Sequence, residues 1–141
     1  MNRVFVAVED MLRYKVEAFT NGDIAKAAEV LAVPTAIYVR DKMMLARDRC
    51  SLIRILETYR QNLVSVGYAR TTLKVHKVRA MSANRVQAHV TWRNLDGDGQ
   101  EINAVEAVYF CEPTPKGCLQ IQIVELRSEL AEHLIKGLPL E

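Results

Sequence analysis

The chain has 141 residues, of which half are hydrophobic and 26% are charged, so it has the composition of one ordinary globular domain. Its 19 basic and 17 acidic residues leave a net charge of only +2, which argues against a general nucleic-acid-binding surface. The sequence shows no apolar run near the ~20 residues of a membrane-spanning helix, and residues 4–8 are too short for a signal-peptide core. We therefore expect one domain over residues 1–141 in a cytoplasmic protein that binds neither nucleic acid nor membrane.

The first third of the chain predicts two helices. Residues 5–19 carry apolar side chains at the three- and four-residue spacing of one helix face. An Asn-Gly-Asp sequence at 21–23 interrupts this pattern, and its aspartate is well placed to cap a second helix. The apolar face of the second helix includes Ile24 and Leu31, and Pro34 is expected to end it.

A hairpin and a longer helix are expected next. Residues 35–46 form two β-prone runs around a polar turn, which predicts a hairpin. Asp48 can cap a third helix, because the apolar side chains between Leu52 and Val66 fall on one face and Gly67 supplies a left-handed stop.

After Gly67 the pattern changes from helical to alternating, which is typical of strands. The pattern predicts four antiparallel strands, at residues 73–81, 86–95, 101–111 and 118–127. Ser128 can cap a last short helix that ends at Gly137. Helices followed by such strands indicate an α+β fold in which the helices pack on one face of a single sheet.

The cysteines and histidines do not predict a metal site or a cofactor. Cys50, Cys111 and Cys118 have no CxxC or zinc-site spacing, and the three histidines share no common face. Cys111 and Cys118 flank a proline-rich turn, so they either face each other in a disulfide or remain two reduced thiols. The lack of a secretory signal favours the thiols.

The alternation in the last three strands predicts one apolar sheet face that carries two acids. Pairing Trp92 with Ala104 and Phe110 with Leu119 sets the register. One face is then apolar except for Glu106 and Glu125, and its members are Val86, Ala88, Val90, Trp92, Ile102, Ala104, Glu106, Val108, Phe110, Leu119, Ile121, Ile123 and Glu125. The opposite face is mixed, which favours a subunit contact through Val105, Ala107, Tyr109 and Val124.

Glu106 is the candidate functional acid in this register. A carboxylate on an apolar face loses solvation, which raises its pKa toward the range of a general acid or base. Glu125 would lie diagonally adjacent and raise the pKa of one of the two carboxyl groups further. A structural alternative stays open, in which Glu106 bonds a helix Lys, Arg or Tyr and locks the helices to the sheet.

Two short motifs point to a known family. Residues 18–23 (Ala-Phe-Thr-Asn-Gly-Asp) are similar to the family's A-L-N-A-G-D helix break, and residues 105–110 (Val-Glu-Ala-Val-Tyr-Phe) are similar to its acid-bearing fifth strand. With the order of elements, they make residues 5–127 resemble the nuclear transport factor 2-like superfamily, specifically its SnoaL-like branch. The resemblance implies a cystatin-like cone, in which helices close the concave face of a curved antiparallel sheet around a cavity, and dimers that form through the outer face.

The resemblance also bears on individual residues. It places Glu106 where isomerases and cyclases of this superfamily keep a pocket acid. The catalytic base of the isomerases would fall near Val39, where this chain has no acid and Asp41 lies in the turn instead. Their helix tyrosine would fall at Lys15, with Tyr14 one residue away and turned about 100° around the helix. Steroid isomerisation is therefore not expected.

We expect an apolar cavity that binds a small hydrophobic molecule, in a homodimer that forms through the outer sheet face. Glu106 is the predicted catalytic residue, for proton transfer of the isomerase, lyase or cyclase type, if the protein is an enzyme. The predicted ligand-binding residues are Leu12, Tyr14, Lys15, Phe19, Leu56, Tyr59, Leu63, Val90, Trp92, Val108, Ile123 and Glu125. The alternative is a non-catalytic homodimeric binding or assembly module whose cavity is filled by its own side chains.

Overall fold

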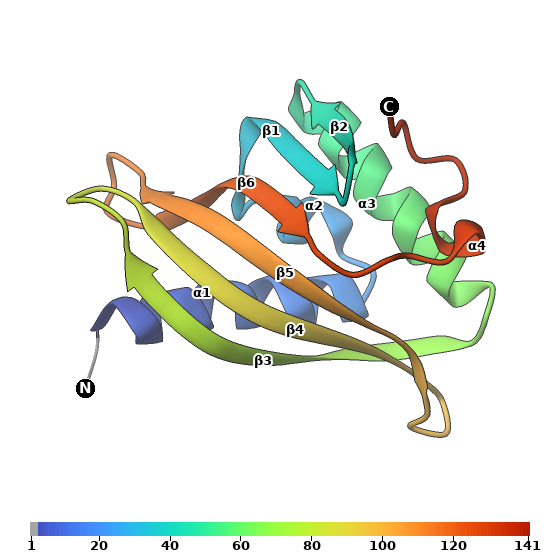
Figure 1. Cartoon of the computed structure of the whole chain (residues 1–141). Coiled ribbons are helices and arrows are strands. Elements are labelled where there is room, and N and C mark those ends of the chain that lie inside the picture. The colour runs from blue at the N-terminus through green and yellow to red at the C-terminus, as the bar shows by residue number, and fades with distance from the viewer. Residues whose placement is uncertain (1–2) are drawn as a thin grey trace.

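The computed structural model describes residues 3–141, which form helices and one six-stranded sheet (Figure 1). In chain order the elements are α1 (Arg3–Thr20), α2 (Ile24–Ala28), β1 (Leu31–Val39), β2 (Lys42–Ala46), α3 (Arg49–Val64), β3 (Tyr68–Ala80), β4 (Val86–Asp96), β5 (Glu101–Pro113), β6 (Leu119–Leu126) and α4 (Glu132–Ile135). The α+β class and the order of elements expected from the sequence are confirmed.

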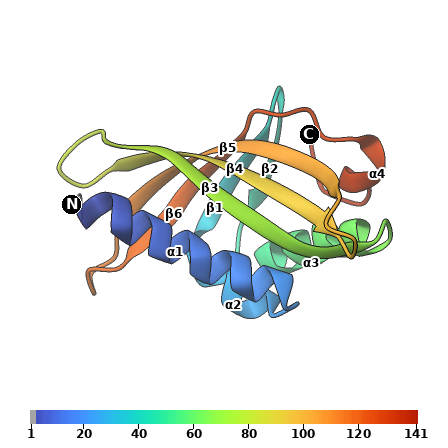
Figure 2. The same ribbon diagram turned by 90° about the horizontal axis from the view of Figure 1, so that it is seen from below.

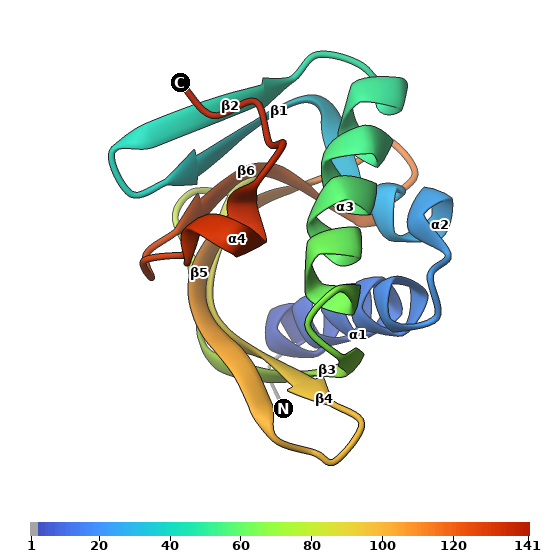
Figure 3. The same ribbon diagram turned by 90° about the vertical axis from the view of Figure 1, so that its right-hand side faces the viewer.

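The sheet is mixed rather than purely antiparallel. Its strand order is β2-β1-β6-β5-β4-β3, and every neighbouring pair is antiparallel except β1 and β6, which run parallel. The sheet curves strongly, and α1 and α3 cover its concave side (Figures 2 and 3). α4 lies at the open end of this curve, beside α3 (Figure 3).

The two ends of helix α3 are set by local capping residues. The Asp48 carboxylate accepts from the Ser51 backbone N–H at 2.8 Å, and the Ser51 hydroxyl accepts from the Asp48 backbone N–H at 3.2 Å, which completes a capping box. At the other end the chain turns through Gly67, whose φ of 95° favours glycine. The predicted third helix is confirmed.

Helix α2 is shorter than the sequence pattern predicts. It begins after its cap Asp23 but ends at Ala28, and both Leu31 and Pro34 belong to β1. The predicted extension was wrong because Leu31 pairs with Ile121 of β6 and buries its side chain, a gain that no local pattern reveals. Pro34 lies in the stretch where the β1–β6 register shifts, as expected of a residue without an N–H.

Ser128 does not cap the last helix. Its hydroxyl accepts from the Glu106 backbone N–H at 2.8 Å, which ties the end of β6 to β5. α4 instead begins after Ala131, with no side-chain cap, so the predicted cap was wrong.

The predicted register of the last three strands was also wrong, because of two β-bulges and a shorter turn between β5 and β6. At the tip of the β4–β5 hairpin Leu95 pairs with Glu101, as the expected register requires, but a register shift after this pair leaves Trp92 opposite Val105 rather than Ala104. In the β5–β6 hairpin the turn is shorter than expected, so that Leu119 pairs with Pro113, and a second register shift between Phe110 and Cys111 leaves Phe110 opposite Ile123. Each bulge adds one residue to one strand and so inverts its alternation.

The bulges exchange the two faces of β5. Val105, Ala107 and Tyr109 are buried on the concave side with Trp92, whereas Glu106 is exposed on the convex side opposite Thr91. In β6 the shift brings Val124 onto the concave side, because it pairs with Tyr109. The outer-face subunit contact predicted for these four apolar residues was therefore assigned to the wrong side of the sheet.

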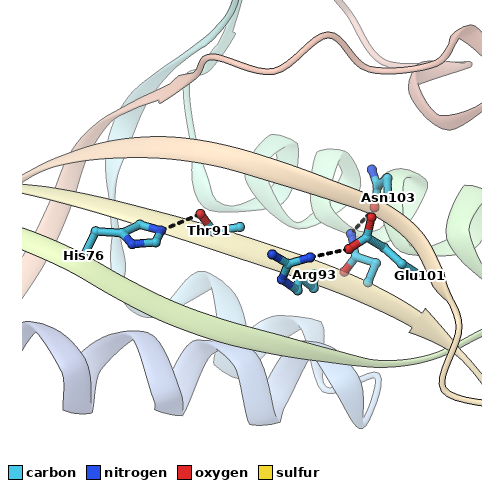
Figure 4. Close-up of polar contacts among 6 residues, drawn as sticks. His76, Thr91, Arg93, Glu101 and Asn103 are labelled. Carbon is cyan, nitrogen blue, oxygen red and sulfur yellow. Dashed lines mark hydrogen bonds and ion pairs between the residues drawn. The ribbon is translucent and has the colours of Figure 1, made fainter.

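The convex side of β3, β4 and β5 carries polar contacts between strands (Figure 4). The His76 side chain is hydrogen-bonded to the Thr91 hydroxyl at 2.6 Å, next to a register shift between Val75 and Lys77. Arg93 of β4 forms an ion pair with Glu101 of β5. These contacts suit a face that borders water.

Candidate functional site

A cavity of about 110 Å³ lies between the concave face of the sheet, helices α1 and α3, and the segment that carries α4. Most of its wall is aliphatic or aromatic. The lining residues are Lys15, Val16, Phe19, Leu31, Ile37, Val39, Met44, Ile55, Leu56, Tyr59, Thr71, Trp92, Asn94, Val105, Tyr109, Val124, Leu126, Leu130 and Leu138.

Trp92 and Tyr109 form a buried pair on the sheet side of this cavity. They project from β4 and β5 onto the same face, and the indole N–H of Trp92 donates to the Tyr109 hydroxyl oxygen at 2.6 Å. Their rings meet edge to face, with centroids 5.9 Å apart at 82°. Burial raises the pKa of Tyr109 far above its ordinary value, so this phenol is neutral at any physiological pH.

Lys15 enters the cavity from α1. It shares a helix face with Leu12 and Phe19, because residues three, four and seven apart fall on one stripe, and this stripe packs toward the sheet. Its Nζ lies 4.7 Å from the centroid of the Trp92 ring. Within residues 3–141 no carboxylate pairs with this amine, and burial lowers its pKa to about 8.

A second polar group sits on the α3 side. The Tyr59 hydroxyl accepts from the side-chain amides of Asn94 and Asn103, each at 3.4 Å. The two amides are themselves joined, since Asn94 donates to Asn103 at 2.7 Å, and the Thr71 hydroxyl donates to the Asn94 carbonyl at 2.7 Å. Burial raises the pKa of Tyr59, so its hydroxyl keeps its proton.

The C-terminal segment closes part of the cavity. Leu130 and Leu138 contribute to its wall. The Asn62 side chain of α3 holds this segment, because it donates to the backbone carbonyls of Leu134 at 3.0 Å and Lys136 at 2.8 Å. The segment ends against β2 (Figure 1), where Met43 and Glu141 exchange two backbone hydrogen bonds.

Five of the predicted ligand-binding residues meet at this cavity, and they are Lys15, Phe19, Leu56, Tyr59 and Trp92. Others on the same side are buried in the core without forming the cavity wall, and these are Leu12, Leu63 and Val90. Tyr14 points away from it, since its side chain is exposed and its hydroxyl donates to the Glu29 carboxylate at 2.7 Å.

Four predicted site residues lie on the convex side instead, and they are Glu106, Val108, Ile123 and Glu125. Glu106 is exposed to solvent, so its expected placement among the apolar residues of the cavity was wrong. Glu125 pairs with Tyr38 of β1 in the sheet and accepts from Arg127 at 3.0 Å. The bulge that inverts each strand is the physical cause.

Sequence reasoning missed Tyr109, Val105, Asn94 and Asn103. A signal was present, because Val105, Ala107, Tyr109 and Cys111 alternate as a uniformly apolar or aromatic set. The alternate set of the same strand contains the charged Glu106, which suits a solvated face better.

The cysteines are all free thiols. Cys111 is buried on the concave side and burial raises its pKa to about 12, whereas Cys118 is exposed, so the disulfide alternative was wrong. Across residues 3–141 no three His, Cys, Asp or Glu side chains gather as a metal site. Nor is any helix there long and apolar enough to cross a bilayer.

Comparisons with known proteins agree on the fold. The family model described as NTF2-like protein (DUF6841) matches residues 8–128. A structure from Nostoc punctiforme, described as a domain of unknown function with a cystatin-like fold, has a TM-score of 0.71 at 15% identity and covers 93% of this chain and 81% of its own. A comparison with curated proteins finds no match.

Two further solved structures are similar to this chain over most of its length. A ketosteroid isomerase-like protein from Erwinia carotovora has a TM-score of 0.65 at 12% identity, over 91% of this chain and 99% of that one. The structure of ActVI-ORFA from Streptomyces coelicolor has a TM-score of 0.70 at 10% identity, over 87% and 93%. At such identities the likeness concerns the fold alone.

Proposed function

Since this chain belongs to the NTF2-like family DUF6841 and encloses a cavity on its concave face, we propose that it binds a small, mainly apolar molecule there. The family expected from the motif resemblance is thereby confirmed, while its SnoaL-like branch stays a prediction. The observation that supports binding is the wall of the cavity, which is mostly apolar and carries a few polar groups directed at one space, as ligand sites usually do.

The cavity also bears on the choice between the two functions expected from the sequence. In a module filled by its own side chains this space would be occupied. The cavity of about 110 Å³ therefore favours binding. Proton transfer by Glu106 loses its support, because that carboxylate lies in water on the far side of the sheet. The geometry thus supports ligand binding best and assigns no particular reaction.

Trp92 provides the test, because it is the only tryptophan of the chain and it lies on the cavity wall. We expect 1-octanol, cyclohexanol and octanoate, added in turn, to change its fluorescence in a saturable way if the cavity binds them. Val16→Phe should abolish saturation, because the larger ring fills space beside Lys15. Glu17→Phe adds the same ring to the exposed side of α1 and should leave binding unchanged.

Failure of all three probes to saturate in the native protein would contradict the proposed function. Equal loss of binding in both variants would point to a general disturbance of α1 and away from the cavity.

We also propose that the convex face joins two copies of this chain. Half-buried or exposed apolar side chains gather there on neighbouring strands, and they are Tyr38, Leu45, Phe110 and Ile123. The same face is acidic at Glu106 and Glu125 and basic along β3, at Lys74 and Lys77. A two-fold axis would set the acidic strands of each copy against the basic strand of the other.

A further inference from the structure

Within the described chain, the wall of the cavity carries a positive charge without a negative one. Among the described residues that line it, Lys15 is the only charged one, and its wall holds no carboxylate. An ammonium group in such a place loses hydration, and the face of the Trp92 ring at 4.7 Å replaces only part of it. The cavity therefore holds a cation for which residues 3–141 provide no counterion.

The neutral polar groups of the cavity also favour a negatively charged ligand, because they offer hydrogen-bond donors. The Tyr109 hydroxyl oxygen accepts from Trp92, and the Tyr59 hydroxyl oxygen accepts from two amides, so each phenol has an acceptor in use and its own proton left to donate. The Asn94 and Asn103 carbonyls already accept from neighbours within their cluster. What remains for a ligand is donors.

A donor-rich apolar space with one positive charge fits one class of molecule. We infer that the ligand is an apolar molecule with a single carboxylate, which Lys15 holds as an ion pair beside the Trp92 ring. A buried ion pair of this kind satisfies both charges only if further donors reach the remaining carboxylate lone pairs, and the two tyrosines face the same cavity. A dianionic group would bring a second charge that no lining residue neutralises.

This inference rests on the proposed function and is tested with two matched probes, octanoate and 1-octanol, which share an alkyl chain and differ in charge. Isothermal titration calorimetry of the native protein near neutral pH should give an affinity for octanoate at least about tenfold tighter than for 1-octanol. Lys15→Met should remove this preference, because octanoate loses the positive charge that would hold its carboxylate. Lys42→Met, an exposed lysine of β2, should behave as the native protein.

The pH dependence in the native protein keeps the test valid even if Lys15→Met folds poorly. The titratable groups that face Lys15 across the cavity are Tyr59 and Tyr109, both with raised pKa, so neither ionises before the amine. Raising the pH from about 7 to about 10 removes the proton of Lys15 while octanoate stays ionised, so octanoate affinity should fall about tenfold or more and 1-octanol affinity should not.

The outcomes separate the two proposals. Equal affinity for both probes, or an octanoate preference that survives Lys15→Met or the rise in pH, overturns the carboxylate inference and leaves the binding function in place. Binding of neither probe overturns the carboxylate inference, and the proposed binding function falls with it only if cyclohexanol also fails to change the Trp92 fluorescence.

Discussion

Lys15 places a positive charge among apolar side chains, at a cost in stability. Its helix position points it toward the core, where an unpaired ammonium destabilises the fold, yet an apolar side chain would pack there without that cost. Residues kept at a cost in stability are found at functional sites. Stability measurements on this residue therefore report on function as well as on packing.

Replacing Lys15 with methionine should stabilise the protein. The folded-state pKa of about 8 lies below the ordinary 10.5, so below about pH 8 the folded chain carries the full penalty of holding the proton. Allowing for partial solvent screening, we expect the free energy of unfolding near neutral pH to rise by about 1 to 2 kcal/mol in Lys15→Met. Urea unfolding measures it, with Lys42→Met as the control.

The same substitution should change how stability depends on pH. Between about pH 8 and 10.5 the unfolded native chain keeps a proton that the folded chain has released, so the native protein gains stability as the pH rises. The difference in unfolding free energy between Lys15→Met and the native protein should therefore shrink across this window. A constant difference would show that the amine is not desolvated.

Removing one partner of the Trp92–Tyr109 hydrogen bond should lower the stability of the protein. Tyr109→Phe leaves the buried indole N–H of Trp92 without its acceptor, and an unpaired buried donor costs about 1 to 3 kcal/mol. Thermal unfolding should show the loss, whereas Tyr38→Phe, at an exposed tyrosine, should change the midpoint little. Equal midpoints for Tyr109→Phe and the native protein would mean that the bond contributes no net stability.

At the scale of elements, α1 and α3 depend on each other through Arg60. Its guanidinium donates from α3 to the backbone carbonyls of Phe19 at 2.7 Å and Thr20 at 2.9 Å, at the end of α1 where carbonyls lack helical partners. It also lies over the Tyr68 ring at 5.7 Å. The two walls of the cavity are joined at this point.

Loss of the Arg60 contact should therefore loosen both helices. Arg60→Met keeps the aliphatic stem but removes the side-chain donor of the Thr20 carbonyl and leaves the Phe19 carbonyl with the Gly22 N–H alone. We expect a loss of about 2 kcal/mol in urea unfolding. Arg54→Met removes an exposed arginine from the same helix and should cost little. Similar losses in the two variants would indicate that α3 responds only to its overall charge.

The elements also show where sequence reasoning succeeds and where it stops. Caps such as Asp23 and Asp48 act within one turn, so the local sequence was sufficient to place them. The bulges in β5 and β6 depend on which strands pair and how the sheet curves, and each reverses the assignment of every side chain beyond it. Hence Lys15 on its helix was placed correctly, whereas Glu106 on its strand was not.

For the whole molecule, the convex face is the surface on which assembly depends. If two copies meet there, Phe110→Glu places a charge in the middle of the contact and should convert a dimer to a monomer in sedimentation velocity. Val64→Glu, at an exposed residue near the end of α3, should leave the dimer intact. A native protein that sediments as a monomer at micromolar concentration would rule the contact out.

The parallel pairing of β1 with β6 has a kinetic consequence. Within residues 3–141, β1 and β2 join the rest of the sheet only through β6, so β1 cannot enter the sheet before β6 has been added. The hairpins of β3, β4 and β5 close local loops and can form early, whereas the β1–β6 contact joins Leu31 to Ile121, across about two thirds of the chain. During synthesis the cavity therefore cannot exist until the last strand leaves the ribosome, and pulse-labelled hydrogen exchange should find the amides of β4 protected before those of β1.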